Sequence, residues 1–398
     1  MPVTTAPPRE AQSCSDPRWQ DRTVVDAAPP DATPARWSVG FLYNAQAHHI
    51  LHSLPLACAL SRHAEVAVTV MSPSATHLAL AERLAGYYPG HRLRFQRLRA
   101  PPGLARSKAV VLLLNATTLA RFDALVLPER TSLLLRRLGV RHPKLIHSFH
   151  GASGHDRAGD PRLAQFDLLL APSAQRLERI AAAGIRPRAA AVTGYNKLDL
   201  IRRMGTDRPQ LFPNSAPVVL YNPHHRPATS SWPLVGRQVL DHFAAQRERN
   251  LVFAPHIRLF DPPAAYRSTF RRYEGLEQLR IDLGSTASID MTYTLGADLY
   301  LGDISSQVTE FLIRPRPCVF LNPRGIDWQG RPDFAAWQLG RVVRTLPEMV
   351  DAIRTADEWQ AEFAERQREA FAEAFPEGEV PAPVQGAEAI LKLLRGER

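Results

Sequence analysis

Lysine, cysteine and long apolar runs are all scarce in this chain, and each scarcity excludes some classes of protein. Only four of the 49 basic residues are lysine, so the net charge of +10 comes from arginines scattered along the sequence. Scattered arginine is typical of the codon bias of a GC-rich genome, whereas a nucleic-acid-binding surface clusters its basic residues. P-loop, zinc-finger and RNP motifs are missing from the sequence. We therefore expect no nucleic-acid partner.

The three cysteines, at positions 14, 58 and 318, form no CxxC pair. They indicate a reduced, cytoplasmic chain without a cysteine-based metal site. No run approaches the eighteen apolar residues of a membrane-spanning helix, and the apolar run 109–114 is typical of a short buried strand. Residues 1–36 hold seven prolines and little periodicity, so we expect a disordered leader there.

Short apolar strands alternate with helical segments after residue 37, which predicts βαβ units and an α/β fold. A polar, proline-containing break near residue 207 divides them. We expect two Rossmann-like domains, 37–206 and 207–375, whose parallel sheets face a central cleft. A long helix over 345–375 is expected to end the second domain, and 376–398 to be a tail with a short helix. The predicted strands are 38–43, 65–71, 92–98, 122–127, 144–149, 166–171, 217–221, 250–255, 279–283, 297–302 and 317–321.

Polar residues at the carboxyl ends of such strands are candidate site residues, because ligands of open α/β sheets bind there. The strand 144–149 leads into a loop with His150, Gly151 and Asp156. Histidine is the usual general base near neutral pH, and glycine lets a backbone approach a ligand closely. We expect His150 to be a catalytic base that Asp156 orients. A loop histidine bonded to backbone is the alternative.

Two further junctions carry basic side chains. Arg226 follows the strand 217–221, and its planar guanidinium suits phosphate oxygens. His256 follows the strand 250–255 and is expected to bind phosphate or to stabilise a leaving group. His224 and His225 are adjacent in sequence, and this spacing does not favour a metal site. A solvated surface arginine is the alternative for Arg226.

The fourth junction is the most specific. Asp303 follows the strand 297–302, and Ser305 and Ser306 open a helix in which Thr309 and Glu310 come next. Hydroxyls, free backbone N–H groups and the helix dipole together favour an anion. Glu310 is expected to reach a ribose or polyol hydroxyl. Ser305 as a simple N-cap is the alternative, and a cap can also hold a phosphate.

The order of these motifs over residues 144–322 resembles the CDP-glycerol glycerophosphotransferases of teichoic acid synthesis and the related capsule-polymer transferases. The family's HGTPLK is matched by HGASGH from His150, and its GYPRND by GYNKLD from Gly194. Its YAPTWR is matched by YNPHHR from Tyr221, and its strand ending in HP by Pro255-His256. Its DYSSxxFE is matched by DISSQVTE from Asp303, and a KPxIFY-like PCVF follows from Pro317.

The resemblance implies a GT-B fold and a transferase that moves glycerol phosphate, or a similar polyol or sugar phosphate, from a CDP-activated donor. The acceptor would be a hydroxyl of a cell-envelope or capsule glycan, polymeric or lipid-linked, with peripheral contact at the inner membrane face. Arg226, His256 and the Ser305-Ser306 helix start would hold the pyrophosphate as CMP leaves. The reaction requires no cofactor, and Mg²⁺ is the one ion kept as an alternative.

Two other hypotheses about the function remain open. One is a GT-B enzyme of another reaction type, either a glycosyltransferase or an epimerase that uses a UDP- or CMP-sugar. The other is a non-catalytic nucleotide-binding sensor, which Ala152 and His155 favour because they replace the family's Thr and Lys.

Overall fold

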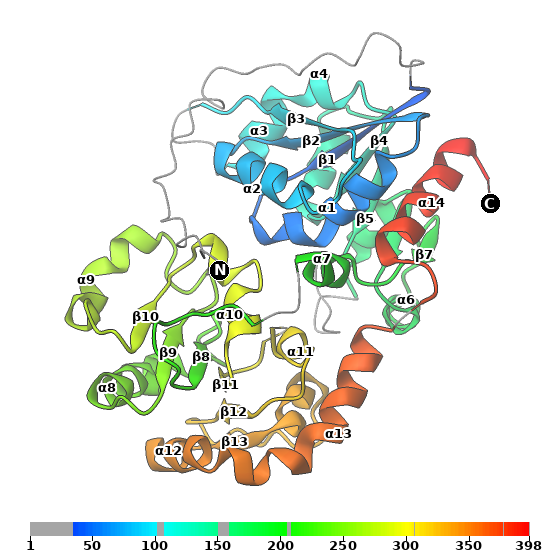
Figure 1. Ribbon diagram of the computed structural model, residues 1–398. Coiled ribbons are helices and arrows are strands. Elements are labelled where there is room, and N and C mark those ends of the chain that lie inside the picture. The colour runs from blue at the N-terminus through cyan, green and yellow to red at the C-terminus, as the bar shows by residue number, and fades with distance from the viewer. Residues whose placement is uncertain are drawn as a thin grey trace, which may run out of the picture.

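Two parallel sheets, one after the other along the chain, form the centres of two units (Figure 1). The structure is a computed structural model and describes residues 35–101, 107–149, 159–204, 208–305, 307–376 and 378–397. The seven strands of the first unit lie in the order β3 (Leu93–Arg97), β2 (Val66–Ser72), β1 (Trp37–Leu42), β4 (Ala124–Leu127), β5 (Lys144–Ser148), β6 (Leu168–Ala171) and β7 (Ala190–Val192). The six strands of the second unit lie in the order β10 (Leu279–Ile281), β9 (Asn250–Phe253), β8 (Val218–Asn222), β11 (Leu299–Gly302), β12 (Cys318–Leu321) and β13 (Arg341–Val343).

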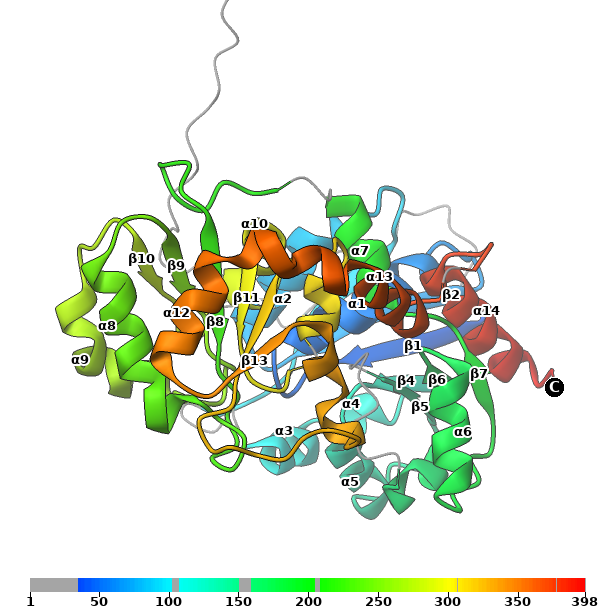
Figure 2. The ribbon, with the colours of Figure 1, turned by 90° about the horizontal axis from the view of Figure 1, so that it is seen from below.

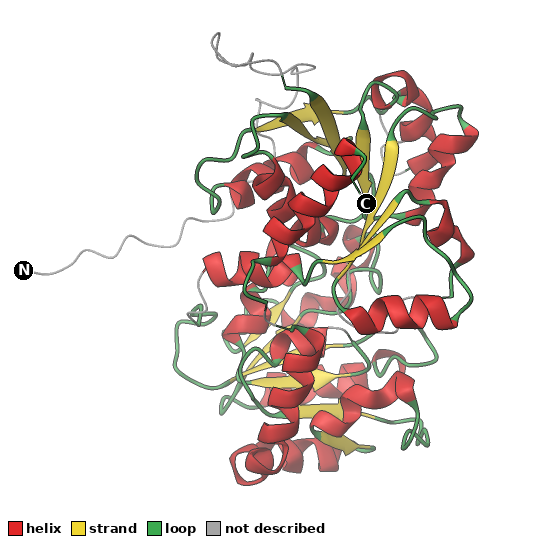
Figure 3. Ribbon diagram, turned by 90° about the vertical axis from the view of Figure 1, so that its right-hand side faces the viewer, coloured by secondary structure: helices red, strands yellow, loops and turns green. Residues whose placement is uncertain are grey.

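Helices cover both faces of each sheet, as the red and yellow elements of Figure 3 show. One face of the first sheet packs on α1 (His48–Leu60), α2 (Ala75–Ala85), α7 (Asn196–Met204) and α14 (Ala382–Arg395). Its other face packs on α3 (Lys108–Leu114), α4 (Ala116–Leu119), α5 (Leu134–Arg137) and α6 (Ala174–Ala182). Because both faces are covered, the central strands are buried along their length, which explains their continuous apolar sequences.

The second sheet has the same layered build. One face packs on α8 (Arg237–Ala245), α9 (Arg267–Phe270), α12 (Leu346–Arg354) and the start of α13 (Ala356–Ala374). The other packs on α10 (Thr292–Gly296), α11 (Gln307–Phe311) and the 3₁₀ segment η8 (Pro332–Leu339). Shorter helical turns are η2 (Arg130–Leu133), η3 (Pro161–Gln165), η4 (Trp232–Gly236), η5 (Pro263–Tyr266), η6 (Arg271–Tyr273) and η7 (Thr286–Ser288).

The chain returns to the first unit at its C-terminal end. Figure 2 shows α13 and α14 following one another from the second unit to the first. Ala387, Ile390 and Leu391 of α14 are fully buried in the core that the first sheet shares with α1. The first unit is therefore built from residues at both ends of the described chain.

The expectation of two Rossmann-like units with parallel sheets is confirmed, and two local predictions are wrong. The run 109–114 is part of the helix α3, which buries Val111 and Leu112 and leaves Leu113 60% exposed. The predicted helix 345–375 is two helices, because the chain leaves helical geometry at Thr355 between α12 and α13.

Candidate functional site

Three histidine rings meet at the carboxyl edge of the second sheet. His224 and His225 follow β8, and His256 follows the neighbouring strand β9. The ring centroids of His225 and His256 lie 4.2 Å apart, those of His224 and His225 4.4 Å, and those of His224 and His256 5.6 Å. The loops that the sequence predicted separately are therefore one site, which we call the histidine cluster.

Burial keeps the histidine cluster uncharged at neutral pH. Loss of solvent, and then the nearby basic side chains, lowers the pKa of His224 and of His225 to about 4 and that of His256 to about 3. Among the described residues, the buried Nδ1 of His225 has no hydrogen-bond partner. Arg226 and Arg258 supply the positive charge beside the rings, and both are exposed. The cluster therefore combines neutral imidazoles with two exposed guanidinium groups.

Asp303 holds the loop that carries these histidines. It directly follows β11 and is fully buried. Its Oδ2 accepts hydrogen bonds from the backbone N–H of His224 at 2.8 Å and from that of Ser231 at 2.9 Å. Burial raises the pKa of its carboxyl to about 7. Asp303 therefore positions the His224 loop, and its predicted contact with substrate stays a prediction.

The close approach of β11 to β8 places Asp303 beside the His224 loop. A Cβ on Gly302, the preceding residue, would lie 2.8 Å from the backbone oxygen of Asn222, so glycine lets β11 approach β8.

Ser305 follows Asp303 closely in sequence, and its Oγ accepts a hydrogen bond from the backbone N–H of Gln307 at the start of α11. Thr309 lies partly exposed in the same helix. Ser306, the other predicted hydroxyl, lies outside the described residues.

Glu310 joins the two units. Its Oε1 accepts a hydrogen bond from the hydroxyl of Tyr195 at 2.7 Å, and its Oε2 pairs with Nζ of Lys197 at 2.6 Å. The side chains of Lys197 and Glu310 are each 6% exposed. The Tyr195 ring also packs on His52 and Phe375, with centroids 5.4 and 4.7 Å away. Two of the motifs that carry the family resemblance thus touch each other, and both oxygens of Glu310 have partners.

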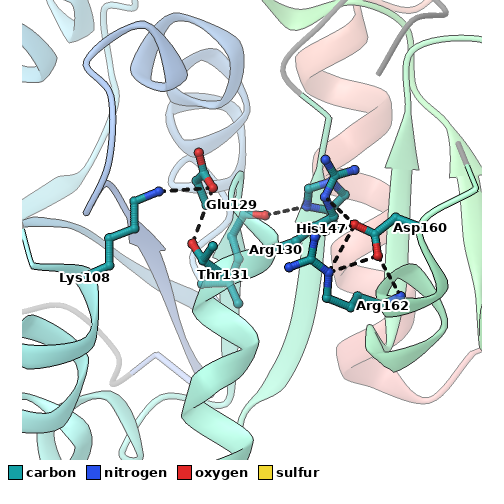
Figure 4. Close-up of polar contacts among 8 residues, drawn as sticks. Lys108, Glu129, Arg130, Thr131, His147, Asp160 and Arg162 are labelled. Carbon is teal, nitrogen blue, oxygen red and sulfur yellow. Dashed lines mark hydrogen bonds and ion pairs between the residues drawn. The ribbon is translucent and has the colours of Figure 1, made fainter. Parts of the chain in front are cut away.

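A group of charged side chains that was not among the predicted site residues lies at the carboxyl edge of the first sheet (Figure 4). Glu129, just after β4, pairs with Lys108 at 3.3 Å and with Nε2 of His49 at 3.5 Å, and it accepts a hydrogen bond from Thr131. A charged pair that directly follows a strand, Glu129-Arg130, is the signal that could have found this group.

Asp160 organises the other half of this group. Arg130 lies 3.3 Å from its carboxylate and Arg162 2.6 Å from it. The hydrogen bond from Arg162 is the main cause that lowers the pKa of Asp160 to about 2. His147 is held by a backbone contact, because its Nδ1 lies 2.8 Å from the backbone oxygen of Leu127.

The predicted catalytic residues His150 and Asp156, with Gly151, lie outside the described residues, and their roles stay predictions.

Across the described ranges, no three His, Cys, Asp or Glu side chains are grouped so that they could hold a metal ion. In the same ranges no helix has the length and apolarity to cross a membrane.

Neither a protein-family model nor a curated protein sequence matches the chain. Solved structures do match. A putative UDP-N-acetylglucosamine 2-epimerase from Listeria monocytogenes aligns with a TM-score of 0.60 and 14% identity, over 91% of this chain and 96% of its own. UDP-GlcNAc 2-epimerase from Neisseria meningitidis, bound to UDP-GlcNAc, aligns with a TM-score of 0.52 and 10% identity, over 90% and 100%. The wall teichoic acid polymerase TagF aligns with a TM-score of 0.57 and 15% identity, over 91% and 88%. This chain therefore has the GT-B fold.

Proposed function

We propose that this GT-B chain is a transferase that moves a polyol phosphate or sugar phosphate from a CDP-activated donor to a hydroxyl of a cell-envelope glycan. The single observation that carries the proposal is the histidine cluster with its two arginines, which lies at the carboxyl ends of β8 and β9 beside the start of α11. Open α/β sheets bind ligands at this edge. The motif order and the likeness in fold to TagF add support.

The charge of the site suits a pyrophosphate diester. Guanidinium groups bind phosphate oxygens in a bidentate manner, and here Arg226 and Arg258 flank imidazoles that can donate hydrogen bonds without carrying charge themselves. In such a site the acceptor oxygen attacks the phosphorus that bears the polyol, the bond from that phosphorus to the bridging oxygen breaks, and CMP leaves. His256 and Arg226 stabilise the negative charge that develops on CMP. His150 is the base that takes the proton of the acceptor hydroxyl.

A second candidate is an enzyme of the same fold that acts on a UDP-sugar, such as a 2-epimerase. The observation that favours it is the similarity to two epimerases, one of them solved with UDP-GlcNAc. Its donor would meet the same basic residues, because both donors carry a pyrophosphate. The two candidates differ in the nucleobase that the site accepts and in the product, which is CMP for the transferase.

Isothermal titration with CDP-glycerol, CDP-ribitol, CMP-sugars and UDP-sugars tests the proposal, first without metal and then with Mg²⁺. We expect binding of a CDP-polyol that weakens in Arg226→Ala and His256→Ala. Arg354→Ala is the matched control, because Arg354 is exposed and pairs with Asp351 on α12, outside the candidate site. Tight binding of a UDP-sugar with no binding of CDP-polyols would contradict the transferase and favour the second candidate.

Turnover separates an enzyme from a binding protein. With an acceptor glycan present, the His256→Ala variant is expected to release CMP about a hundredfold more slowly, because one electrostatic contact to a developing charge contributes roughly 3 kcal/mol. Donor binding with no CMP release from the unaltered protein, across a panel of acceptors, would instead support the sensor reading.

A further inference from the structure

An open groove lies along the outer edge of the second sheet. Its walls come from the loop after β12, from η8, from β13 and from α13, and its volume is about 650 Å³. Figure 1 shows β13 at this edge with α13 beside it. None of the lining residues belongs to the histidine cluster or to the start of α11.

Three arginines line the groove, and no carboxylate does. They are Arg341, Arg344 and Arg366, and among the described residues none of them forms an ion pair. Two arginines of the helices α12 and α13 are paired, since Arg354 lies 2.6 Å from Asp351 and Arg368 lies 2.6 Å from Glu365. Arg366 also donates a hydrogen bond to the backbone oxygen of Gln338. No carboxylate in the lining neutralises the three guanidinium groups, and this favours an anionic ligand.

Aromatic side chains form part of the same wall. Trp337 lines the groove and is itself only 2% exposed. Trp328, whose ring centroid lies 5.9 Å from that of Trp337, and Phe363 supply apolar ring faces in the lining. Rings of this kind pack against the CH faces of a sugar or polyol.

We propose that this arginine groove binds a phosphate-bearing sugar or polyol, at a site separate from the donor site. The guanidinium groups hold the phosphate, and the aromatic rings of the lining cover the carbon skeleton of the ligand. The volume is in the usual range of small-molecule sites, about 300–1,000 Å³. This inference does not depend on the proposed transferase activity.

Titration of the full chain with glycerol 3-phosphate, glucose 1-phosphate and inorganic phosphate tests the groove. The Arg344→Ala/Arg366→Ala variant is expected to bind the two organic phosphates at least about tenfold more weakly, since each lost guanidinium removes a charge-assisted hydrogen bond. Arg354→Ala/Arg368→Ala is the matched control, with one exposed arginine removed from each neighbouring region, and is expected to bind as the unaltered protein does. Equal weakening in the two double variants would overturn the proposal.

Two further outcomes keep this test distinct from that of the proposed function. If inorganic phosphate binds as tightly as the organic phosphates, the groove is a general anion site and the proposed ligand class is wrong. If Arg226→Ala abolishes binding of glycerol 3-phosphate while the groove variant retains it, the ligand occupies the histidine cluster and the proposal fails. If the unaltered protein binds the organic phosphates but no CDP-polyol, the proposed transferase is contradicted and the proposal for the arginine groove stands.

Discussion

At the scale of single residues, the histidine cluster has ionisation properties that suit an anion. Its three imidazoles are neutral at pH 7 because burial lowers their pKa values well below the ordinary value near 6.5. Burial raises the pKa of Asp303 beside them to about 7, well above the ordinary value of a carboxyl group. A bound anion shifts both kinds of group in the same direction, toward the protonated form.

This shared direction predicts how donor affinity depends on pH. A pyrophosphate diester does not titrate between pH 6 and 8, so proton uptake on binding comes from the protein. Binding raises the pKa of the imidazoles and of Asp303, and affinity for CDP-glycerol therefore increases as the pH falls from 8 to 6. Titration calorimetry in buffers of different ionisation enthalpy measures the protons taken up. Asp303→Asn is expected to reduce that uptake, and an affinity independent of pH would contradict the prediction.

At the scale of elements, the central strands were predictable, whereas two of the four edge strands, β7 and β13, were not predicted. β8, β11 and β12 lie at the centre of a parallel sheet, and their uninterrupted apolar residues placed them correctly to within about two residues at each end. β7 and β13 each have three residues at a sheet edge, too few for a periodic pattern. The apolar run within α3 shows the same limit, because a short run fits a strand or a helix equally well.

The candidate site was predictable for the same physical reason. Arg226, His256 and Asp303 directly follow central strands, so topology alone brings them to one edge. The partners of Glu310 were not predictable, because Lys197 is 113 residues away in sequence and meets it only when the two units pack. Glu129 and Asp160 were not predicted, because Glu129 pairs with Lys108 and Asp160 with Arg130, and each of these partners lies about 20 to 30 residues away in sequence.

The close approach of β13 to β12 gives a prediction for Gly340. An added Cβ at this position would lie 2.0 Å from the backbone oxygen of Cys318, which cannot move without disturbing the sheet. We expect Gly340→Ala to destabilise the protein by about 1–3 kcal/mol, the usual cost of overpacking. Gly159→Ala is the control, because its added Cβ meets its nearest neighbour at an ordinary 3.8 Å. Thermal unfolding of the two variants measures the difference, and equal midpoints would contradict the argument.

At the scale of the whole molecule, the polar contacts between the units in the described ranges differ in burial. The Lys197–Glu310 pair is buried on both sides, whereas Arg83, which pairs with Asp290 across the units at 3.2 Å, is 49% exposed. Exposed ion pairs contribute little to stability, whereas the removal of one partner of a buried pair is strongly destabilising. We therefore expect the buried pair to contribute more to stability than the exposed one.

Single and double substitutions at the Lys197–Glu310 pair test how much it contributes to the free energy of unfolding. Lys197→Met leaves the carboxylate of Glu310 buried with Tyr195 alone, and we expect a loss of about 3–5 kcal/mol. Lys197→Met/Glu310→Gln removes both charges and is expected to recover much of that loss. The midpoints of urea unfolding of the two variants give the comparison. A double variant no more stable than Lys197→Met would show that the pair is not coupled.

The return of α14 to the first unit affects how the protein folds during its synthesis. Leu56 of α1 packs against Gly386, and the apolar face around it is completed by Ile390 and Leu391. A ribosome releases these residues after the whole second unit has been made. The first unit therefore leaves the ribosome with part of its core uncovered. This part is covered only when α14, more than 300 residues downstream of α1, has been synthesised. Chaperones that recognise apolar surface have a long interval in which to bind it.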